Sequence, residues 1–199
     1  MDHIDGFPLL ETENYILRRI TQQDVEAIFS YFSDEEVTKY YDLDTFEDIS
    51  EAYRFVTSKE KMFLESRGIR WGITTKDRRD RVIGTIGFHN WNRSFFKAEI
   101  SYELSKEHWG QGLMSEVIPC VLEYGFESME LNRIEALLHP ENIGSKRVLK
   151  KANFRHEGTL EEYVFLKGRF IDTEIMALLK RNFKKHVALG QRGQEPVSR

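Results

Sequence analysis

A strand-like segment, a glycine turn and a helix-like segment follow one another between residues 98 and 126. Polar and apolar residues alternate over 98–104, which predicts a strand, and apolar residues over 113–126 recur at the three-to-four spacing of a helix. Gly110 and Gly112 lie between the two, in the stretch EHWGQGLMSE at 107–116. Such glycines let main-chain amides at the start of a helix approach a pyrophosphate. They could equally serve only as a tight turn from strand to helix.

Two other phosphate-binding motifs are excluded by their spacing. A P-loop requires a glycine, four residues and then Gly-Lys-Ser/Thr, and the chain contains no such string. The dinucleotide fingerprint requires a third glycine where this chain has Ser115. The remaining functional alternative is a short turn whose successive amides bind a pyrophosphate with the help of the helix dipole.

The N-terminal part of the chain predicts a strand followed by two helices. Residues 15–20 have the composition of a strand, and capping-box spacings at 21–24 and 45–48 predict the start of a helix after each. The second helix is expected to run to about residue 66, because apolar residues keep a helical spacing up to that point.

The rest of the chain predicts an antiparallel sheet with one more helix. A short helix is expected after Asn142, and Asn153 is placed where a left-handed helix cap would lie. The expected strands are a hairpin at 71–75 and 82–88, the strand at 98–104, a strand at 131–139, and a closing hairpin at 162–166 and 170–178.

Composition limits the class of protein. With 199 residues and 40% hydrophobic content, we expect a single domain over 1–185 and a disordered tail over 186–199. The net charge of −4 gives no indication of a nucleic-acid or membrane partner. The single cysteine, Cys120, cannot form an internal disulfide, and the six histidines lack metal-ligand spacing, so no metal is expected. Without a signal peptide or a long apolar run, a cytoplasmic location is predicted.

Three motifs in this order resemble one family over nearly the whole chain. The stretch at 107–116, the sequence HPENIGS at 139–145 and the sequence LKGRFID at 166–172 are similar to the GNAT superfamily of N-acetyltransferases. Within it they look like the ribosomal-protein-alanine N-acetyltransferase branch, the RimJ/RimL type. The resemblance implies an α/β (α+β) fold, with a central, mostly antiparallel mixed sheet that contains a splayed strand pair and is flanked by helices. It also implies acetyl-CoA as co-substrate.

The resemblance assigns the cofactor site residue by residue. Main-chain groups of Tyr102, Glu103 and Leu104 would bind the pantetheine arm, and Asn142 and Ser145 would contact it from the helix after residue 142. The pyrophosphate would be bound by the turn residues Trp109, Gly110, Gln111, Gly112, Leu113, Met114 and Ser115. Trp109 stands where the family usually has Arg or Gln, so one polar phosphate contact is missing.

The catalytic assignments also follow from the resemblance. Glu99 matches the general base of some members, and Val164 occupies the place of a Glu that serves as base in the RimJ/RimL branch. Glu162, two residues earlier and expected on the same strand face, is the second candidate. Ser145 is the candidate acid for the leaving thiolate, because Leu149 replaces the usual Tyr. Each acid could instead be a solvated carboxylate, and Ser145 could be an ordinary helix-start residue.

The expected activity is transfer of an acetyl group to an amine, directly within a ternary complex. The acceptor would be the N-terminal amine of a protein, such as a ribosomal protein, or a small-molecule amine; a non-catalytic acyl-CoA-binding or regulatory module is the alternative. Eight acidic residues against Lys39 over 34–51 could attract a cationic acceptor, or could simply be a solvated surface. A monomer or a homodimer is expected.

Overall fold

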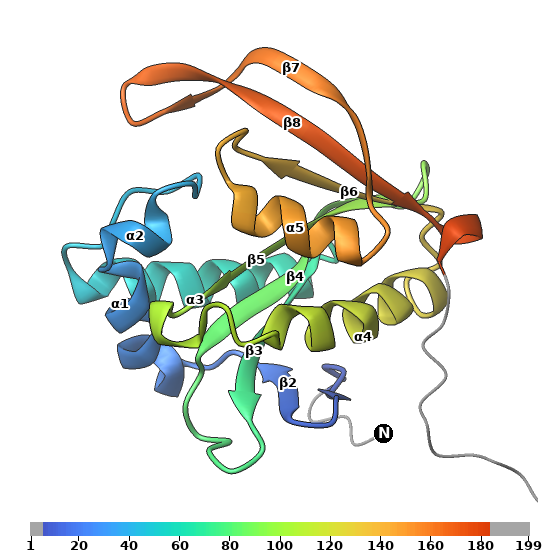
Figure 1. Cartoon of the computed structure of the whole chain (residues 1–199). Coiled ribbons are helices and arrows are strands. Elements are labelled where there is room, and N and C mark those ends of the chain that lie inside the picture. The colour runs from blue at the N-terminus through green and yellow to red at the C-terminus, as the bar shows by residue number, and fades with distance from the viewer. Residues whose placement is uncertain (1–5, 184–199) are drawn as a thin grey trace, which may run out of the picture.

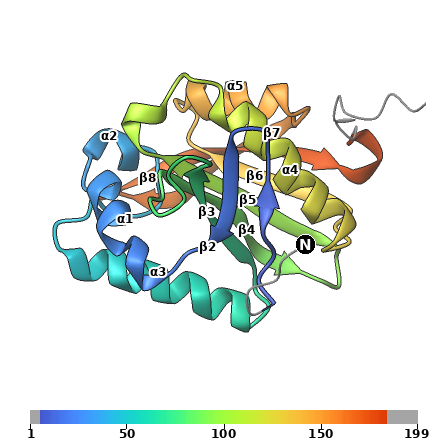
Figure 2. The ribbon, with the colours of Figure 1, turned by 90° about the horizontal axis from the view of Figure 1, so that it is seen from below.

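A single mixed sheet lies between two layers of helices. The structure, a computed structural model, describes residues 6–183. Within them, eight strands pair in the order β1-β2-β3-β4-β5-β6-β8-β7 (Figures 1 and 2). Every neighbouring pair is antiparallel except β5 and β6. The strands are β1 (Leu10–Glu11), β2 (Tyr15–Arg19), β3 (Ile69–Thr75), β4 (Gly84–Asn92), β5 (Lys97–Leu104), β6 (Arg133–Leu138), β7 (Arg155–Leu166) and β8 (Arg169–Leu179).

The helices divide between the two faces of the sheet, as the view from below shows (Figure 2). One layer consists of α1 (Val25–Phe32), α2 (Glu35–Thr38) and α3 (Ile49–Leu64). The other consists of α4 (Leu113–Glu127) and α5 (Ile143–Lys151). Short 3-10 turns are η1 (Gln22–Asp24), η2 (Lys106–His108) and η3 (Lys180–Asn182). Among the described residues, no helix is long and apolar enough to cross a membrane.

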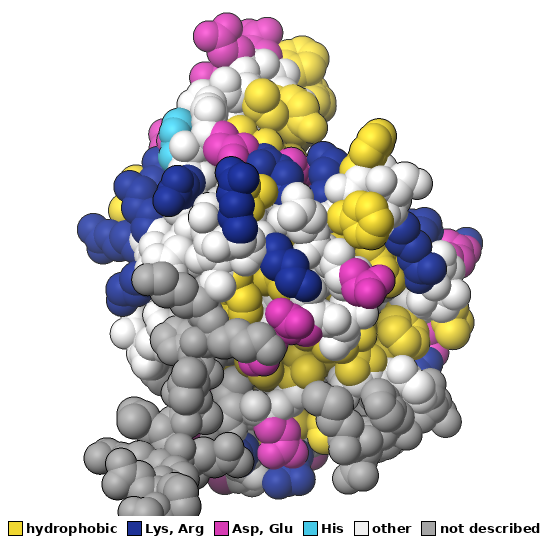
Figure 3. Space-filling model, turned by 90° about the vertical axis from the view of Figure 1, so that its right-hand side faces the viewer, with side chains coloured by type: hydrophobic (Ala, Val, Ile, Leu, Met, Phe, Trp, Pro, Cys, Tyr) yellow, Lys and Arg dark blue, Asp and Glu magenta, His cyan; other side chains and the backbone are white. Residues whose placement is uncertain are grey.

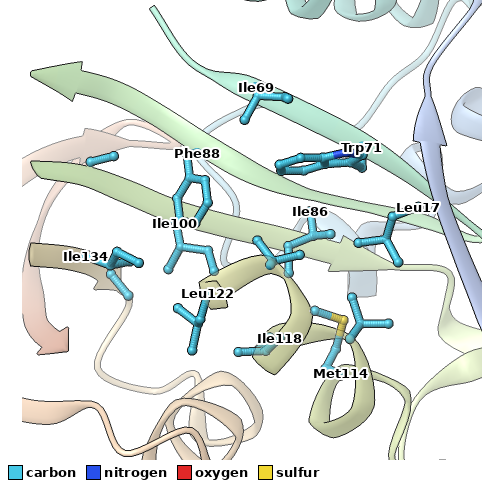
Figure 4. Packing of buried hydrophobic residues seen from close by; sticks show 14 of the residues in the cluster. Leu17, Ile69, Trp71, Ile86, Phe88, Ile100, Met114, Ile118, Leu122 and Ile134 are labelled. Carbon is cyan, nitrogen blue, oxygen red and sulfur yellow. The ribbon is translucent and has the colours of Figure 1, made fainter. Parts of the chain in front are cut away.

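The main core lies between the sheet and α4. Trp71, Phe88 and Ile100 extend from the strands toward Ile118 and Leu122 of the helix, and all five are almost fully buried (Figure 4). Burying such large apolar side chains is the principal source of stability and fixes α4 against the strands. A second cluster around Phe32 packs α1 and α3 together on the other face.

The strands β5 and β6 pair only at their beginning. Their parallel register joins Lys97 to Arg133 and continues to Glu99 and Glu135, where it ends. Beyond that point β5 remains paired with β4, and β6 remains paired with β8. The two strands therefore separate, which confirms the expected splayed pair and leaves one edge of 100–104 free to bind a ligand.

Two local predictions at helix ends have different outcomes. The capping box of Thr21 and Asp24 is present, but the one expected from Thr45 to Asp48 is wrong. Asp48 itself caps α3, and its capping-box partner is Glu51. α3 begins only at Ile49, so Thr45 lies before its N-cap, with its hydroxyl 2.6 Å from that of Thr38.

The closing hairpin forms where expected but is longer. Lys167 and Gly168 both have positive φ values, 48° and 81°, as a tight hairpin turn requires. However, β7 begins at Arg155, well before the predicted strand at 162. Asn153 adopts the expected left-handed conformation, with a φ of 66°. The predicted disordered tail lies outside the described residues.

Candidate active site

A cavity of about 580 Å³ opens where β5 and β6 separate. Its walls come from 99–102 of β5, 136–138 of β6, the start of α5, the β7–β8 hairpin, the segment 40–43 and α3. Of the residues expected to act in catalysis or cofactor binding, Glu99, Tyr102, Asn142 and Ser145 line it. The splay thus brings together side chains from β5 and α5 that are far apart in sequence.

The glycine turn at the start of α4 has the geometry of an anion site. Gly110 and Gly112 have φ values of 74° and 82°, in the left-handed region that only glycine adopts readily. The first amides of a helix generally lack intrahelical acceptors. Here the amide of Ser115 already donates to the carbonyl of Gly112 at 2.9 Å, so an anion would be bound mainly by the amides before it. A Cβ built on either glycine would meet no atom within 4 Å, so the space beside the turn is open.

Trp109 attaches this turn to the end of β5. Its indole Nε1 donates a hydrogen bond of 2.9 Å to the carbonyl of Leu104. The residue that replaces the family's usual Arg or Gln therefore holds the turn beside the free edge of the splayed strand. The carbonyl oxygen of Leu104 keeps a second lone pair for a ligand.

Ser145 and Tyr102 form a hydroxyl pair on the cavity wall. Asn142 caps α5 by accepting a 3.0 Å hydrogen bond from the amide of Ser145. This fixes Ser145 with its Oγ 2.8 Å from the phenol oxygen of Tyr102. Burial raises the pKa of Tyr102 to about 12, although the Ser145 hydrogen bond opposes the shift. The phenol therefore remains a proton donor at neutral pH.

Glu99 faces the cavity with two polar neighbours from β4. Its Oε2 lies 3.3 Å from Nε2 of His89, and its Oε1 accepts a 3.0 Å hydrogen bond from the Asn90 amide. The hydrogen bond from His89 lowers the pKa of the Glu99 carboxyl below its ordinary value, while partial burial opposes that shift. Glu99 is thus an ionised carboxylate at the point where β5 and β6 separate.

A buried polar network, missed by the sequence analysis, lies beneath this carboxylate. The Arg70 guanidinium forms an ion pair with Glu103, and both side chains are almost fully buried. Arg70 also donates to the hydroxyls of Thr85 and Tyr41, at 2.6 and 2.9 Å. Its other Nη donates to the carbonyl and hydroxyl oxygens of Ser101, at 3.2 and 2.6 Å. All five guanidinium donors are thereby used, so Arg70 orders the site rather than binding substrate.

Comparison with known proteins identifies the family. Residues 14–155 match the family described as acetyltransferase (GNAT) domain. The chain belongs to the GNAT family. A Bacillus subtilis (strain 168) protein, named an uncharacterized N-acetyltransferase, YoaA, is 45% identical over 174 residues, which cover 87% of this chain and 98% of that one.

Further relatives agree with this assignment. The uncharacterized N-acetyltransferase p20 of Bacillus licheniformis is 40% identical over 174 residues, covering 87% and 97% of the two chains. The crystal structure of a GNAT-family acetyltransferase from Bacillus anthracis superposes with a TM-score of 0.77 at 26% identity, covering 87% and 99%. The protein is therefore an acetyl-CoA-dependent N-acetyltransferase, and the alternative of a non-catalytic module is set aside.

Glu162 lies outside the cavity of this GNAT domain. The register between β7 and β8 shifts between Leu160 and Val164, and Glu162 has a φ of 48° within that bulge. The alternation of side chains along β7 is therefore interrupted. Val164 lines the cavity, whereas Glu162 is exposed and does not line it. The expected common face of these two residues is wrong, because the sequence does not reveal the bulge.

Lys59 is a cavity residue that sequence analysis did not identify. It extends from α3 into the cavity wall, with its Nζ 4.6 Å from the centre of the Phe55 ring. The pKa of Lys59 is lowered to about 8, mainly by burial and secondly by the nearby positive charge of Arg70. In the sequence it simply continues the helical stripe, and nothing in that pattern indicates a cavity.

The eight acids over 34–51 fall into three groups: helix caps, one cavity residue, and four further exposed residues, Glu35, Glu36, Asp44 and Glu47. Asp34 and Asp48 cap α2 and α3, and Glu51 completes the second cap, so these acids have structural roles. Asp42 lines the cavity together with Tyr40 and its neighbours. Only one of the eight acids is therefore placed directly at the site. Among the described residues, no group of three or more His, Cys, Asp or Glu is arranged to hold a metal ion.

Proposed function

We propose that this N-acetyltransferase transfers acetyl directly from acetyl-CoA to an amine within a ternary complex at the splay. One observation carries the proposal: Glu99 and the Ser145–Tyr102 pair line the same cavity, on either side of the free edge of β5. A carboxylate base and a hydroxyl acid are the two proton-handling groups that aminolysis of a thioester requires.

The proposed cofactor path runs from the glycine turn along β5. The amides over 110–115 bind the pyrophosphate, and the free main-chain edge over 102–104 binds the pantetheine arm, with Asn142 and Ser145 on its other side. A structure of RimL, a ribosomal L7/L12 α-N-protein acetyltransferase, in complex with coenzyme A shares this fold at a TM-score of 0.78 and 17% identity.

Basic residues of α5 are proposed to supply the charge that the turn itself lacks. Lys151 and Ser115 line a small hollow of about 60 Å³ between α4 and α5. Arg147, Lys150 and Lys151 are all exposed on α5. Their positive charge would attract the phosphates of acetyl-CoA. Lys and Arg side chains also gather on the face in Figure 3, but this face is the right-hand side of Figure 1, away from the glycine turn at the start of α4.

In the proposed reaction the amine nitrogen attacks the thioester carbonyl carbon. The C–S bond breaks, Glu99 receives the proton lost by the amine, and the Ser145 hydroxyl, backed by Tyr102, donates a proton to the departing sulfur. Arg70 and His89 hold the surroundings of Glu99 in place. The products are the N-acetylated amine and CoA.

The acceptor is proposed to be a protein N-terminus, as in the RimJ/RimL branch, or a small cationic amine. The ribosomal-protein-serine acetyltransferase of Escherichia coli (strain K12) is 31% identical over 98 residues, which cover 49% of this chain. The spermidine N(1)-acetyltransferase of Vibrio cholerae is 23% identical over 167 residues, which cover 84% of this chain. Asp42 on the cavity wall favours a cation in either case.

A two-variant experiment tests the catalytic assignment. Acetyl-CoA consumption is measured with a panel of N-terminal peptides of ribosomal proteins and polyamines, for wild type, Glu99→Gln and Glu162→Gln. Glu99→Gln should lower turnover by roughly 10²- to 10⁴-fold, the usual contribution of a general base. Glu162→Gln is the matched control and should retain activity. If Glu162→Gln lost activity and Glu99→Gln retained it, the general base would be Glu162 in the β7 bulge and not Glu99.

A further inference from the structure

Ser101, His89 and Glu99 form a line within the cavity. The Ser101 hydroxyl oxygen lies 3.3 Å from Nδ1 of His89, and Nε2 of the same ring lies 3.3 Å from Oε2 of Glu99. All three residues line the cavity. His89 of β4 and Glu99 of β5 are direct partners in the antiparallel register, so the sheet itself holds the imidazole beside the carboxylate.

The hydrogen-bond partners determine where the protons lie. An ionised carboxylate only accepts, so Glu99 favours the tautomer with the proton on Nε2 and leaves Nδ1 of His89 as an acceptor. Arg70 donates a 2.6 Å hydrogen bond to Ser101 Oγ, which leaves the hydroxyl proton of Ser101 free to point at Nδ1. The guanidinium would also stabilise negative charge developing on that oxygen.

This order of hydroxyl, imidazole and carboxylate is the arrangement of a serine nucleophile activated by a base. We propose that it gives the enzyme a second activity, the acceptor-independent hydrolysis of acetyl-CoA through an acetyl ester on Ser101. The proposal rests on the acetyl-CoA site described under Proposed function, because that site would bring the thioester into the cavity that Ser101 lines.

The reaction is balanced with water as the only additional reactant. Ser101 Oγ attacks the thioester carbonyl carbon and its proton passes to His89 Nδ1; the C–S bond then breaks and the thiolate takes that proton. Water next attacks the acetyl ester, with His89 again accepting the proton and returning it to Ser101 as the C–O bond breaks. The products are CoA and acetic acid. Glu99 stabilises the imidazolium in both steps.

A second serine–histidine contact in the chain provides a matched control. Ser105 Oγ lies 2.6 Å from Nδ1 of His108, which is closer than the pair in the cavity. The carboxylate of Glu107 lies 3.7 Å from Nδ1 of His108, the same nitrogen that contacts Ser105, and not beside Nε2 as Glu99 does at His89. Neither Ser105 nor His108 lines the cavity. A hydrogen bond to histidine is thus present at both places, but the line of three groups is present only at Ser101.

The test has one arm that does not need the CoA site. The full-length protein is treated with a fluorophosphonate probe and with p-nitrophenyl acetate, and modified peptides are located by mass spectrometry. We expect the label on Ser101 and not on Ser105. Labelling should fall by roughly 10²-fold or more in His89→Gln, because the base is lost. Ser101→Ala should abolish it, with folding of both variants checked by thermal unfolding.

The other arm uses acetyl-CoA without an amine. Wild type should release CoA slowly. After a rapid acid quench, its Ser101 peptide should carry an acetyl group. His89→Gln should show neither CoA release nor acetylated Ser101. If acetyl-CoA binds in calorimetry but Ser101 reacts with none of the three reagents, the proposal is overturned. If the probe and the small ester modify Ser101 while acetyl-CoA does not bind, the triad is supported and the proposed cofactor site fails instead.

Discussion

The hydroxyl oxygens of Tyr102 and Ser145 lie 2.8 Å apart, although these residues are 43 positions apart in sequence. The contact joins the free part of β5 to the first turn of α5 on the wall of the cavity. Leu149, one turn further along α5, is buried and cannot donate a proton. Tyr102 of the sheet thus supplies the phenol that α5 lacks. It lies beside Ser145, which faces the proposed position of the CoA sulfur.

Replacing either hydroxyl should slow the chemical step more than it weakens cofactor binding. Ser145→Ala is expected to lower kcat by about 10²-fold, the lower range for loss of proton transfer. Tyr102→Phe should lower kcat by less, because Ser145 still remains. The measurement is steady-state kinetics with acetyl-CoA varied at saturating amine. Equal losses in both kcat and acetyl-CoA affinity would mean that the pair only positions the pantetheine arm.

A side chain at Gly112 should prevent binding of CoA without preventing folding. The site is open, so Gly112→Val would place its methyl groups where the pyrophosphate is proposed to lie. Gly168→Val is the matched control, because Gly168 has a φ of 81° against 82° for Gly112 and lies in the β7–β8 turn. Both variants should lose a similar stability of roughly 1–2 kcal/mol from left-handed strain. Calorimetry should show CoA binding to Gly168→Val only.

The sequence predicts the features that depend on local patterns. The glycine turn, the capping box at Thr21 and the left-handed Asn153 follow from the conformational preferences of single residues, and the structure has all three. Glu99 could be proposed from the resemblance, and the structure places its side chain in the cavity. Such features depend on neighbours a few positions away, which a sequence displays directly.

The features that sequence analysis missed depend on distant contacts. Nothing in the alternation of β7 indicates the bulge that exposes Glu162, because a bulge is fixed by pairing with β8. The buried pair of Arg70 and Glu103 joins two strands separated by β4, so neither local sequence contains it. A charged residue within an otherwise apolar strand, such as Arg70 in IRWGITT, is the one available indication.

The lowered pKa of Lys59 predicts how stability depends on pH. Between about pH 8 and the ordinary value of 10.5, the unfolded chain binds more protons at this residue than the folded chain does. Below that window, burying the charged Lys59 therefore lowers the free energy of unfolding. This penalty disappears as the pH rises through the window. Lys59→Met should be more stable than wild type at about pH 7, and the difference should narrow toward about pH 10.

Urea denaturation of both proteins across this range measures the effect. Lys61→Met is the control, since Lys61 lies on the same helix with its side chain 68% exposed. Its difference from wild type should change little with pH. A difference for Lys59→Met that stays constant from about pH 7 to about pH 10 would show that the ammonium is well solvated in the folded protein.

Asp42 should determine how well a cationic acceptor is used. It is the one acid of the segment 34–51 on the cavity wall, whereas Asp44, two residues later, is exposed and outside it. Asp42→Lys is therefore expected to raise the KM of a cationic amine several-fold, and Asp44→Lys to raise it much less. Acetyl-CoA is an anion bound at the distant glycine turn, so its KM should stay the same or fall slightly in both variants.

Salt distinguishes attraction at long range from direct contact. The Debye length shrinks from about 10 Å at 0.1 M salt to about 3 Å at 1 M, so a field from several acids would weaken strongly over that range. Because Asp34, Asp48 and Glu51 serve as helix caps, we expect the acceptor KM of wild type to rise with salt mainly through Asp42. The salt dependence should therefore nearly vanish in Asp42→Asn and persist in Asp44→Asn. Equal salt slopes in wild type and both variants would leave the whole acidic segment as a solvated surface.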